Sequence, residues 1–179
     1  ILSPADCTAT VKATIAAAGI DAPVYLRLTG SMNNPIVYKE DFDFEIGKAI
    51  ELRQGDDVAI IATGSMVHCA LKAAEHLEAM GISASVLDMH TIKPLDITAV
   101  EAACKRKLLV TVEEHSIIGG LGSAVAEKLA LKTIHPPHLI IGAPDVYPHA
   151  GDYVSLLDSC GLTPDKVAGK ILETYKELF

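Results

Sequence analysis

Four short apolar runs in the second part of the chain constrain its fold more than any other feature of the sequence. The runs are VAIIA, SASVLDM, LLVTV and HLII, all beyond Gly55, and a stretch with helical periodicity follows each of them. Strands that are apolar on both faces are typical of a parallel sheet that helices cover on both sides. The alternation therefore predicts a βαβ series with right-handed crossovers, that is, an α/β domain.

Polar residues and glycines indicate where the helices of this series begin and end. Thr63 or Ser65 is expected to cap the first helix, which stops at Gly81. Asp96 opens the second helix, which closes on the cations at residues 105–107, where the helix dipole favours positive charge.

The chain begins with a helix and a strand that precede the regular series. Ser3–Asp6 predicts a helix start at which Ser3 is the expected cap, and Gly19 predicts its left-handed stop. The alternation in Val24–Leu28 predicts a strand. The polar, turn-rich stretch from Asn33 to Asp41 indicates a linker.

The first helix carries an apolar face for which its own segment provides no sheet. The face consists of Cys7, Val11, Ile15 and Ala18. We expect it to pack on the C-terminal domain, on a second copy of the chain or on a missing domain. Because one helix and one strand cannot enclose a core, residues 1–40 are interpreted as the end of a preceding α/β domain with its linker, and residues 41–179 as a second domain.

Charge and cysteine usage exclude several classes of function. The chain has 15 basic and 23 acidic residues, a net charge of −8, and no basic stripe that could neutralise a run of phosphates. No apolar run approaches the roughly 20 residues that span a bilayer. The four cysteines form no CxxC pair, which indicates buried thiols in a reducing compartment. We therefore expect a cytoplasmic protein that binds neither nucleic acid nor a membrane.

The strongest local motif is VEEHSIIGGLGSAVAE, in which a buried strand leads through glycines into a helix. Ligands of open α/β sheets bind at the carboxyl ends of strands, and glycines let a helix N-terminus approach an anion. The motif is therefore a possible anion site or subunit contact, formed by Glu113, Glu114, His115, Gly120 and Gly122.

A dinucleotide site is the less favoured interpretation of this motif. Val125 stands where the third small residue of the fingerprint belongs, and no acidic residue ends the following strand. A tight strand-to-helix turn with close packing explains the glycines, and Glu113 and Glu114 would point to opposite faces of a continued strand.

Arg27 is the residue that we single out for ligand binding. It lies near the carboxyl end of its predicted strand, and its planar guanidinium suits phosphate. The alternative is an arginine at a solvated sheet edge. The histidines give a weaker signal: His135 and His138 lack a nearby third ligand for zinc, and His90 is a minor candidate at the edge where ligands bind.

Four stretches in order resemble the C-terminal section of transketolase and its thiamine-diphosphate-dependent relatives. They are SPAD…PVYLRL at Ser3–Leu28, FEIGKAIELRQGDDVAIIATG at Phe44–Gly64, VLDMHTIKPLD at Val86–Asp96 and VEEHSIIGGLGSAVAE at Val112–Glu127. The resemblance implies a three-layer α/β/α domain with a mostly parallel, five-stranded mixed sheet, whose first strand near Phe44–Ile46 runs antiparallel. It also implies that residues 1–40 are the last helix and strand of the pyrimidine-binding domain, with the linker.

The resemblance further implies an activity, the transfer of a two-carbon ketol unit between sugar phosphates with thiamine diphosphate and Mg²⁺ or Ca²⁺. The arginine with which the family binds substrate phosphate falls on Arg27. The family's Gly-Asp-Gly motif, its ring-activating Glu and its substrate-channel histidines have no counterpart here. We therefore expect no catalytic residue, cofactor site or metal site in this chain, which would be inactive alone.

The partners implied are the remaining transketolase domains or a separate N-terminal subunit, in a homo- or hetero-oligomer. Three alternatives stay open. The first is the matching section of a deoxyxylulose-phosphate synthase or of a 2-oxoacid dehydrogenase β subunit. The second is a non-catalytic interaction or regulatory module, and the third is a Rossmann-type nucleotide binder.

Overall fold

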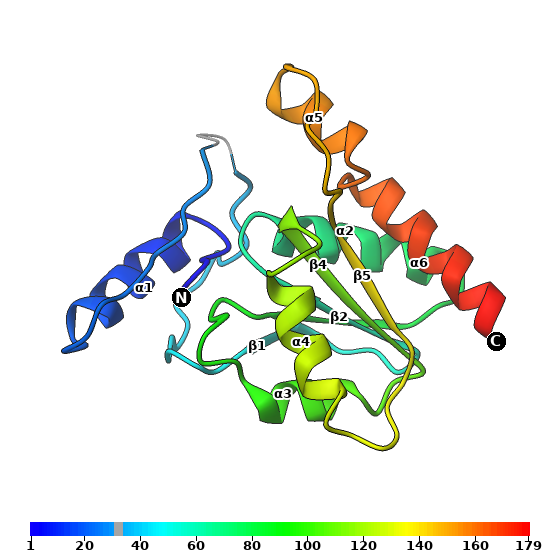
Figure 1. The fold of residues 1–179 in the computed structure, drawn as a ribbon, viewed down its shortest axis with the longest axis horizontal. Helices are drawn as coiled ribbons and strands as arrows, with labels where there is room; N and C mark the ends of the chain where they lie inside the picture. Colours follow the sequence, from blue (N-terminus) through cyan, green and yellow to red (C-terminus); the bar gives the residue numbers. More distant parts are fainter. Residues whose placement is uncertain (31–33) are drawn as a thin grey trace.

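A five-stranded mixed sheet with the strand order β1-β3-β2-β4-β5 forms the centre of the computed structural model, which describes residues 1–30 and 34–179 (Figure 1). The strands are β1 (Ile50–Arg53), β2 (Val58–Ala62), β3 (Ala84–Asp88), β4 (Leu108–Ser116) and β5 (His138–Ala143). β1 runs antiparallel to β3, whereas the pairs β2–β3, β2–β4 and β4–β5 are parallel. The predicted fold class is confirmed, because each of the four apolar runs forms a strand.

Helices cover both faces of the sheet. α2 (Met66–Ala79) and α6 (Pro164–Leu178) lie on one face, and α3 (Ile97–Ala103) and α4 (Leu121–Leu129) lie on the other (Figure 1). In β2, Val58, Ile60 and Ala62 pack into the α2 and α6 layer, whereas Ala59 and Ile61 pack into the α3 and α4 layer. This is why β2 reads as an unbroken apolar run: both of its faces are covered. α5 (Tyr153–Ser159), which the sequence patterns did not predict, precedes α6.

The antiparallel first strand lies at Ile50–Arg53 and not near Phe44–Ile46, so its predicted position is wrong. The aromatic rings before it serve as packing surfaces and not as strand residues. Phe42 stacks on Tyr38 with ring centroids 3.7 Å apart, and Phe44 stacks on His90 at 4.1 Å. The alternation of apolar residues therefore arises because these rings pack on the core, and not because the segment is a strand.

The predicted strand at Val24–Leu28 is also wrong. Within the described residues, this segment makes a single bridge, from Leu26 to Leu2, and Leu2 in turn bridges Thr91. The amide N–H of Leu2 donates to the carbonyl oxygen of Tyr25, and that of Arg27 donates to the carbonyl oxygen of Leu2, both at 2.8 Å. Leu2 therefore links the segment around Arg27 to the chain that follows β3. The division into units 1–40 and 41–179 stays a prediction.

α1 (Cys7–Ala18) buries a different face from the predicted one. Ala9 and Ala13 are buried, whereas Val11 and Ile15 are 59% and 69% exposed. Small alanine side chains allow close packing, and Ala9 belongs to the same core cluster as Tyr38. The two remaining members of the predicted face, Cys7 and Ala18, are both exposed. The expectation of buried thiols is confirmed only at Cys69, because Cys7 is exposed and Cys104 and Cys160 are partly exposed.

Both predicted ends of α1 need correction. Asp6 caps the helix, because its Oδ1 accepts the amide N–H of Ala9 at 2.8 Å. Its Oδ2 accepts the amide N–H groups of Val37 and Tyr38 at 2.7 and 2.9 Å, so the same carboxylate fixes the described part of the predicted linker. Gly19 follows the helix with a φ of −85°, which is not left-handed. Asn33, where the linker was predicted to begin, lies outside the described residues.

The helix ends in the second part are predicted better. Asp96 caps α3, and its carboxylate accepts the amide N–H of Ala99 at 2.9 Å. Gly81, with a φ of +81°, follows α2 as predicted. α3 ends at Ala103, before the cations at residues 105–107. The hydroxyls of Thr63 and Ser65, which were predicted to cap α2, donate instead to Met89 and Glu114.

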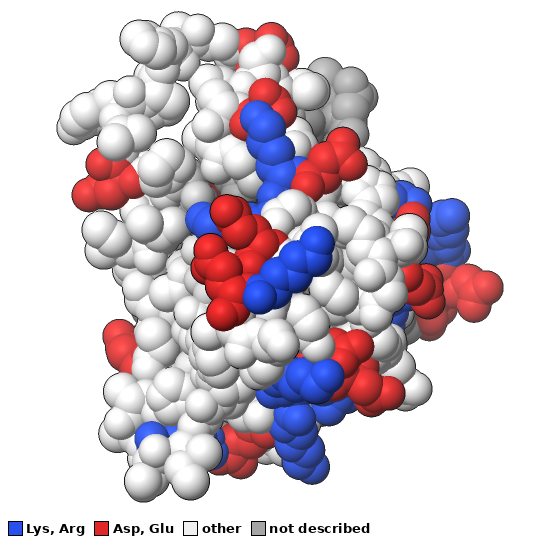
Figure 2. Space-filling view, turned by 90° about the vertical axis from the view of Figure 1, so that its right-hand side faces the viewer, with Lys and Arg blue, Asp and Glu red and all other residues white. Residues whose placement is uncertain are grey.

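One face of the molecule carries charges of both signs. On the face seen in Figure 2, acidic and basic side chains are interspersed. The described residues also form surface ion pairs, such as Lys107–Asp57 and Lys166–Asp158, both at 2.8 Å. No helix in the described ranges has the length and apolar character needed to cross a membrane.

Candidate functional site

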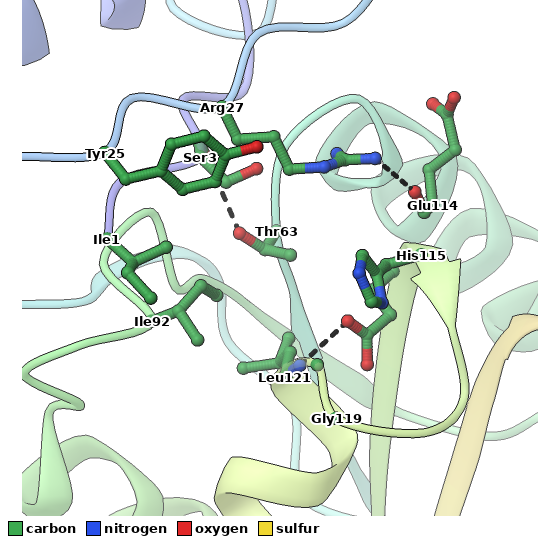
Figure 3. A pocket seen from close by; sticks show the side chains of 12 residues that line it. Ile1, Ser3, Tyr25, Arg27, Thr63, Ile92, Glu114, His115, Gly119 and Leu121 are labelled. Atoms are coloured by element: carbon green, nitrogen blue, oxygen red, sulfur yellow. Dashed lines mark hydrogen bonds between the residues drawn. The ribbon is translucent and has the colours of Figure 1, made fainter.

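A pocket of about 180 Å³ opens at the carboxyl ends of β2 and β4 (Figure 3). It brings together five of the six predicted site residues, namely Arg27, Glu113, Glu114, His115 and Gly120. The other residues that line it are Ile1, Ser3, Tyr25, Thr63, Ile92, Gly119 and Leu121. The N-terminal segment therefore forms one wall of the pocket and the β4–α4 connection another. Gly122, the sixth predicted residue, lies in the first turn of α4 and does not line the pocket.

The guanidinium of Arg27 crosses the pocket to the end of β4. Its Nη2 donates to the carbonyl oxygen of Glu114 at 2.6 Å, as Figure 3 shows. In the described ranges no carboxylate forms an ion pair with Arg27. A neutral carbonyl leaves the positive charge of the half-buried guanidinium uncompensated, and guanidinium suits bidentate binding of phosphate. The pocket therefore presents one guanidinium without a salt-bridge partner among the described residues, beside two glutamates whose carboxylates are engaged elsewhere.

The side chain of Glu114 points away from Arg27 (Figure 3). Its Oε2 accepts hydrogen bonds from the hydroxyls of Ser65 and Tyr153, the latter at 2.5 Å. Ser65 is the N-cap residue of α2 and Tyr153 the first residue of α5. Burial, and then the hydrogen bond to Glu114, raise the pKa of Tyr153 to about 12, so this hydroxyl stays protonated at neutral pH.

Glu113 occupies the N-terminus of α4. Its Oε2 accepts the amide N–H of Leu121 at 2.8 Å, and its Oε1 accepts that of Gly122 at 2.7 Å. Glu113 is 2% exposed. The anion that the motif predicted at this helix N-terminus is therefore the chain's own carboxylate.

The two glycines of the motif permit close packing. A Cβ at Gly120 would lie 2.0 Å from Oε2 of Glu113, and a Cβ at Gly122 would lie 2.5 Å from Cγ2 of Ile140. This geometry agrees with the tight strand-to-helix turn, and Glu113 stands where a dinucleotide phosphate would lie. The two carboxylates also diverge as predicted, because Glu113 binds α4 while Glu114 binds Ser65 and Tyr153 on other helices.

The histidines form no shared site. His115 is exposed at the pocket, and its Nδ1 lies 3.1 Å from the carbonyl oxygen of Ser116. His90 is buried, its Nδ1 lies 3.0 Å from Oγ1 of Thr91, and burial lowers its pKa to about 4. His138 lies on β5, and burial likewise lowers its pKa to about 4. Across residues 1–30 and 34–179, no group of three His, Cys, Asp or Glu side chains is arranged to hold a metal ion.

The sequence patterns missed the two hydroxyl residues that hold Glu114. Ser65 was interpreted as a helix cap, but its side chain donates to Glu114 and makes no cap bond. Thr63, the alternative cap, donates to the carbonyl oxygen of Met89 at 2.9 Å. The position of Ser65 after a strand was the one signal that could have indicated its role at this site. No sequence signal indicated the role of Tyr153.

Fold and pocket together define the class of protein: a three-layer α/β domain with a pocket at the carboxyl ends of its parallel strands, the edge where ligands of such sheets bind. Comparison with known families gives the particular family. Residues 47–167 match the family model "Transketolase, C-terminal domain", and the chain belongs to this family.

Relatives agree over nearly the whole chain. A protein of Methanocaldococcus jannaschii described as "Putative transketolase C-terminal section" is 40% identical over 179 residues, which are 99% of this chain and 56% of that protein. The 1-deoxy-D-xylulose-5-phosphate synthase of Caldanaerobacter subterraneus is 35% identical over 99% of this chain and 29% of its own length. A solved structure titled "Split gene transketolase, inactive beta4 tetramer" superposes with a TM-score of 0.89, at 39% identity over 99% of this chain and 57% of that one. The chain thus spans about half the length, or less, of these relatives.

Proposed function

We propose that this chain is the C-terminal section or subunit of a transketolase-type enzyme, and that Arg27 binds the phosphate of its sugar phosphate substrates. The enzyme transfers a two-carbon ketol unit from a ketose phosphate to an aldose phosphate. The observation that carries the proposal is the guanidinium of Arg27, which is held in the pocket by the carbonyl oxygen of Glu114 and pairs with no carboxylate of the described chain. Its uncompensated charge provides what a phosphate needs.

The remainder of the active site belongs to other domains in this proposal. Transketolases and deoxyxylulose-phosphate synthases are thiamine diphosphate enzymes, but the described residues do not fit that cofactor. Neither carboxylate of the pocket is free to hold the cofactor's metal ion, because Glu113 holds the N-terminus of α4 and Glu114 accepts the hydroxyls of Ser65 and Tyr153. Thiamine diphosphate and its Mg²⁺ or Ca²⁺ are therefore assigned to the domains that complete the enzyme, as is all covalent chemistry.

The split nature of two relatives supports a subunit or a section over an independent module. One is described as a C-terminal section and the other as a split gene transketolase. We accordingly propose a complex with the remaining domains, on the same chain or on a separate N-terminal subunit, in the cytoplasm. A synthase of 1-deoxy-D-xylulose 5-phosphate is the second candidate, because such an enzyme is 35% identical over nearly the whole chain.

Reconstitution tests both candidates. The chain is combined with the domains that complete it, and ketol transfer and formation of 1-deoxy-D-xylulose 5-phosphate are each assayed with and without it. We expect ketol transfer only in the combined enzyme. Arg27→Ala should raise the KM for phosphorylated substrates about tenfold or more, since a hydrogen bond to a charged group contributes roughly 1.5–3 kcal/mol.

Arg106→Ala is the matched control. Arg106 is also an arginine that donates to a backbone carbonyl, that of Gly55 at 2.5 Å, but it lines a different pocket. Its replacement should leave the KM unchanged. Equal activity of the Arg27→Ala enzyme and the parent enzyme on phosphorylated sugars would contradict the role of Arg27.

A further inference from the structure

The carbonyl oxygen that holds Arg27 belongs to a part of β4 outside the regular ladder. β4 pairs with β2 as far as Val112, and its register against β5 shifts between Val112 and Ser116. Glu114 lies inside this irregular stretch. Regular pairing fixes a carbonyl direction through hydrogen bonds on both sides, and Glu114 has no such regular pairing. Contacts of its side chain can therefore contribute to the orientation of its peptide group.

The side chain of Glu114 makes two such contacts. Its carboxylate accepts the hydroxyl of Ser65, at the start of α2, and the hydroxyl of Tyr153, at the start of α5. Hydrogen bonds to a carboxylate are stronger than those between neutral groups. Tyr153 is half-buried, and Asp152 caps its helix by accepting the amide N–H of Ser155 at 3.0 Å. Both donors are thus parts of ordered helix starts.

The result is a chain of two contacts from α5 to the pocket. Tyr153 holds the Glu114 carboxylate, the Glu114 carbonyl oxygen holds Nη2 of Arg27, and the remaining guanidinium N–H groups are left for a ligand. A guanidinium binds phosphate through a rigid planar fork, so a change in its direction weakens binding without removing its charge.

We propose that Glu114, Ser65 and Tyr153 are positioning residues that orient Arg27, so that the C-terminal domain sets the preference of the enzyme for phosphorylated substrates. The inference rests on the proposed function, because it concerns the same arginine. It adds that residues on α2 and α5, which do not touch the substrate, control its phosphate contact.

The test is kinetic and uses the reconstituted enzyme. Tyr153→Phe removes one donor and keeps the ring, Ser65→Ala removes the other, and Glu114→Gln removes the charge of the acceptor. Each should raise the KM for a sugar phosphate roughly three- to tenfold, the effect of losing one hydrogen bond. The kcat, and the KM for the same sugar without its phosphate, should not change. Tyr147→Phe is the matched control, because Tyr147 is fully exposed.

A second measurement reports on Arg27 without turnover. In the 179-residue chain, ¹⁵N relaxation of the Arg27 Nε–Hε group should show a more mobile guanidinium in Tyr153→Phe than in Tyr147→Phe. If Tyr153 had a purely structural role, Tyr153→Phe would lower thermal stability. The mobility of the Arg27 guanidinium and the KM difference between the two sugars would then not change.

The outcomes separate the two proposals. If Arg27→Ala raises the KM for the sugar phosphate while Tyr153→Phe, Ser65→Ala and Glu114→Gln do not, the positioning inference is wrong and the role of Arg27 stands. If Arg27→Ala has no effect, both are wrong. If the three variants raised the KM equally for phosphorylated and unphosphorylated sugars, the positioning inference would also be wrong.

Discussion

Arg27 and Glu114 are 87 positions apart in the chain, yet the guanidinium of one donates to the carbonyl oxygen of the other at 2.6 Å. The contact ties the N-terminal segment to the interior strand β4. It also holds the guanidinium without cancelling its charge, which a carboxylate partner would do. This arrangement agrees with the phosphate-binding role that we propose for Arg27.

The buried carboxylate of Glu113 should be a major source of stability. Glu113→Ala would leave the amide N–H groups of Leu121 and Gly122 without their acceptor, at the buried start of α4. We expect the free energy of unfolding to fall by about 2–4 kcal/mol, measured by urea denaturation. Glu113→Gln keeps one carbonyl oxygen and should lose less. Glu173→Ala, at an exposed position of α6, is the control. The prediction would be wrong if Glu113→Ala lowered the free energy of unfolding no more than Glu173→Ala does.

Two glycine substitutions should have opposite signs. Gly120→Ala places a Cβ 2.0 Å from the Glu113 carboxylate, which must then give up hydrogen bonds, and we expect a loss of about 1–3 kcal/mol. Gly169→Ala, inside α6 with no atom within 4 Å of its new Cβ, should gain about 0.5–1 kcal/mol from helix propensity. Adding Gly120→Ala to Glu113→Ala should cost less than their sum. If the losses of free energy of unfolding were fully additive in the double variant, the contact between the new Cβ and the Glu113 carboxylate would not be their cause.

Asp88 should make the protein less stable as pH rises. Its carboxyl group is buried, Oδ2 accepts the hydroxyl of Tyr38 at 2.7 Å, and Oδ1 has no hydrogen-bond partner among the described residues. Burial raises the pKa of Asp88 to about 7, the negative charge of Asp6 adds to the rise, and the bond from Tyr38 opposes it. The folded state thus keeps a proton that the unfolded chain releases near pH 3.9, so this group costs stability increasingly from about pH 4 to about pH 7.

Asp88→Asn removes this titration. We expect the stability of the variant relative to the parent to rise over that pH range and then to level off, measured by urea denaturation at a series of pH values. Asp145→Asn, at an exposed position, should give no such trend. A constant difference between parent and Asp88→Asn from pH 4 to pH 8 would show that Asp88 is ionised throughout.

Asp6 should control how firmly the N-terminal segment is held. Its carboxylate accepts the amide N–H groups of Ala9, Val37 and Tyr38. Asp6→Ala should cost about 2–3 kcal/mol and speed hydrogen exchange at the Tyr38 amide, because a helix cap and two further bonds are lost. Asp21→Ala, at an exposed position, is the control. Unchanged exchange at Tyr38 in the Asp6→Ala chain would rule out this role.

The sequence determined those features whose cause is local or repeats along the chain. β2 reads as a strand because all five of its residues are buried on a sheet covered on both faces, and Asp96 caps α3 through a neighbour three positions away. It also placed Glu113, Glu114 and His115 at the ligand-binding edge, because the carboxyl ends of parallel strands lie together.

Tertiary structure decided which partner each residue has. Alternation around Val24–Leu28 and Phe44–Ile46 indicates that one side of each segment is covered, but a strand also needs a neighbouring backbone to pair with. The first segment makes only an isolated bridge with Leu2, and the second packs Phe44 on the ring of His90. Likewise, the hydroxyls of Ser65 and Tyr153 meet Glu114 from 49 and 39 positions away. Hydrogen bonds act over about 3 Å, so only the folded chain, and no sequence pattern, determines which distant groups come within that reach.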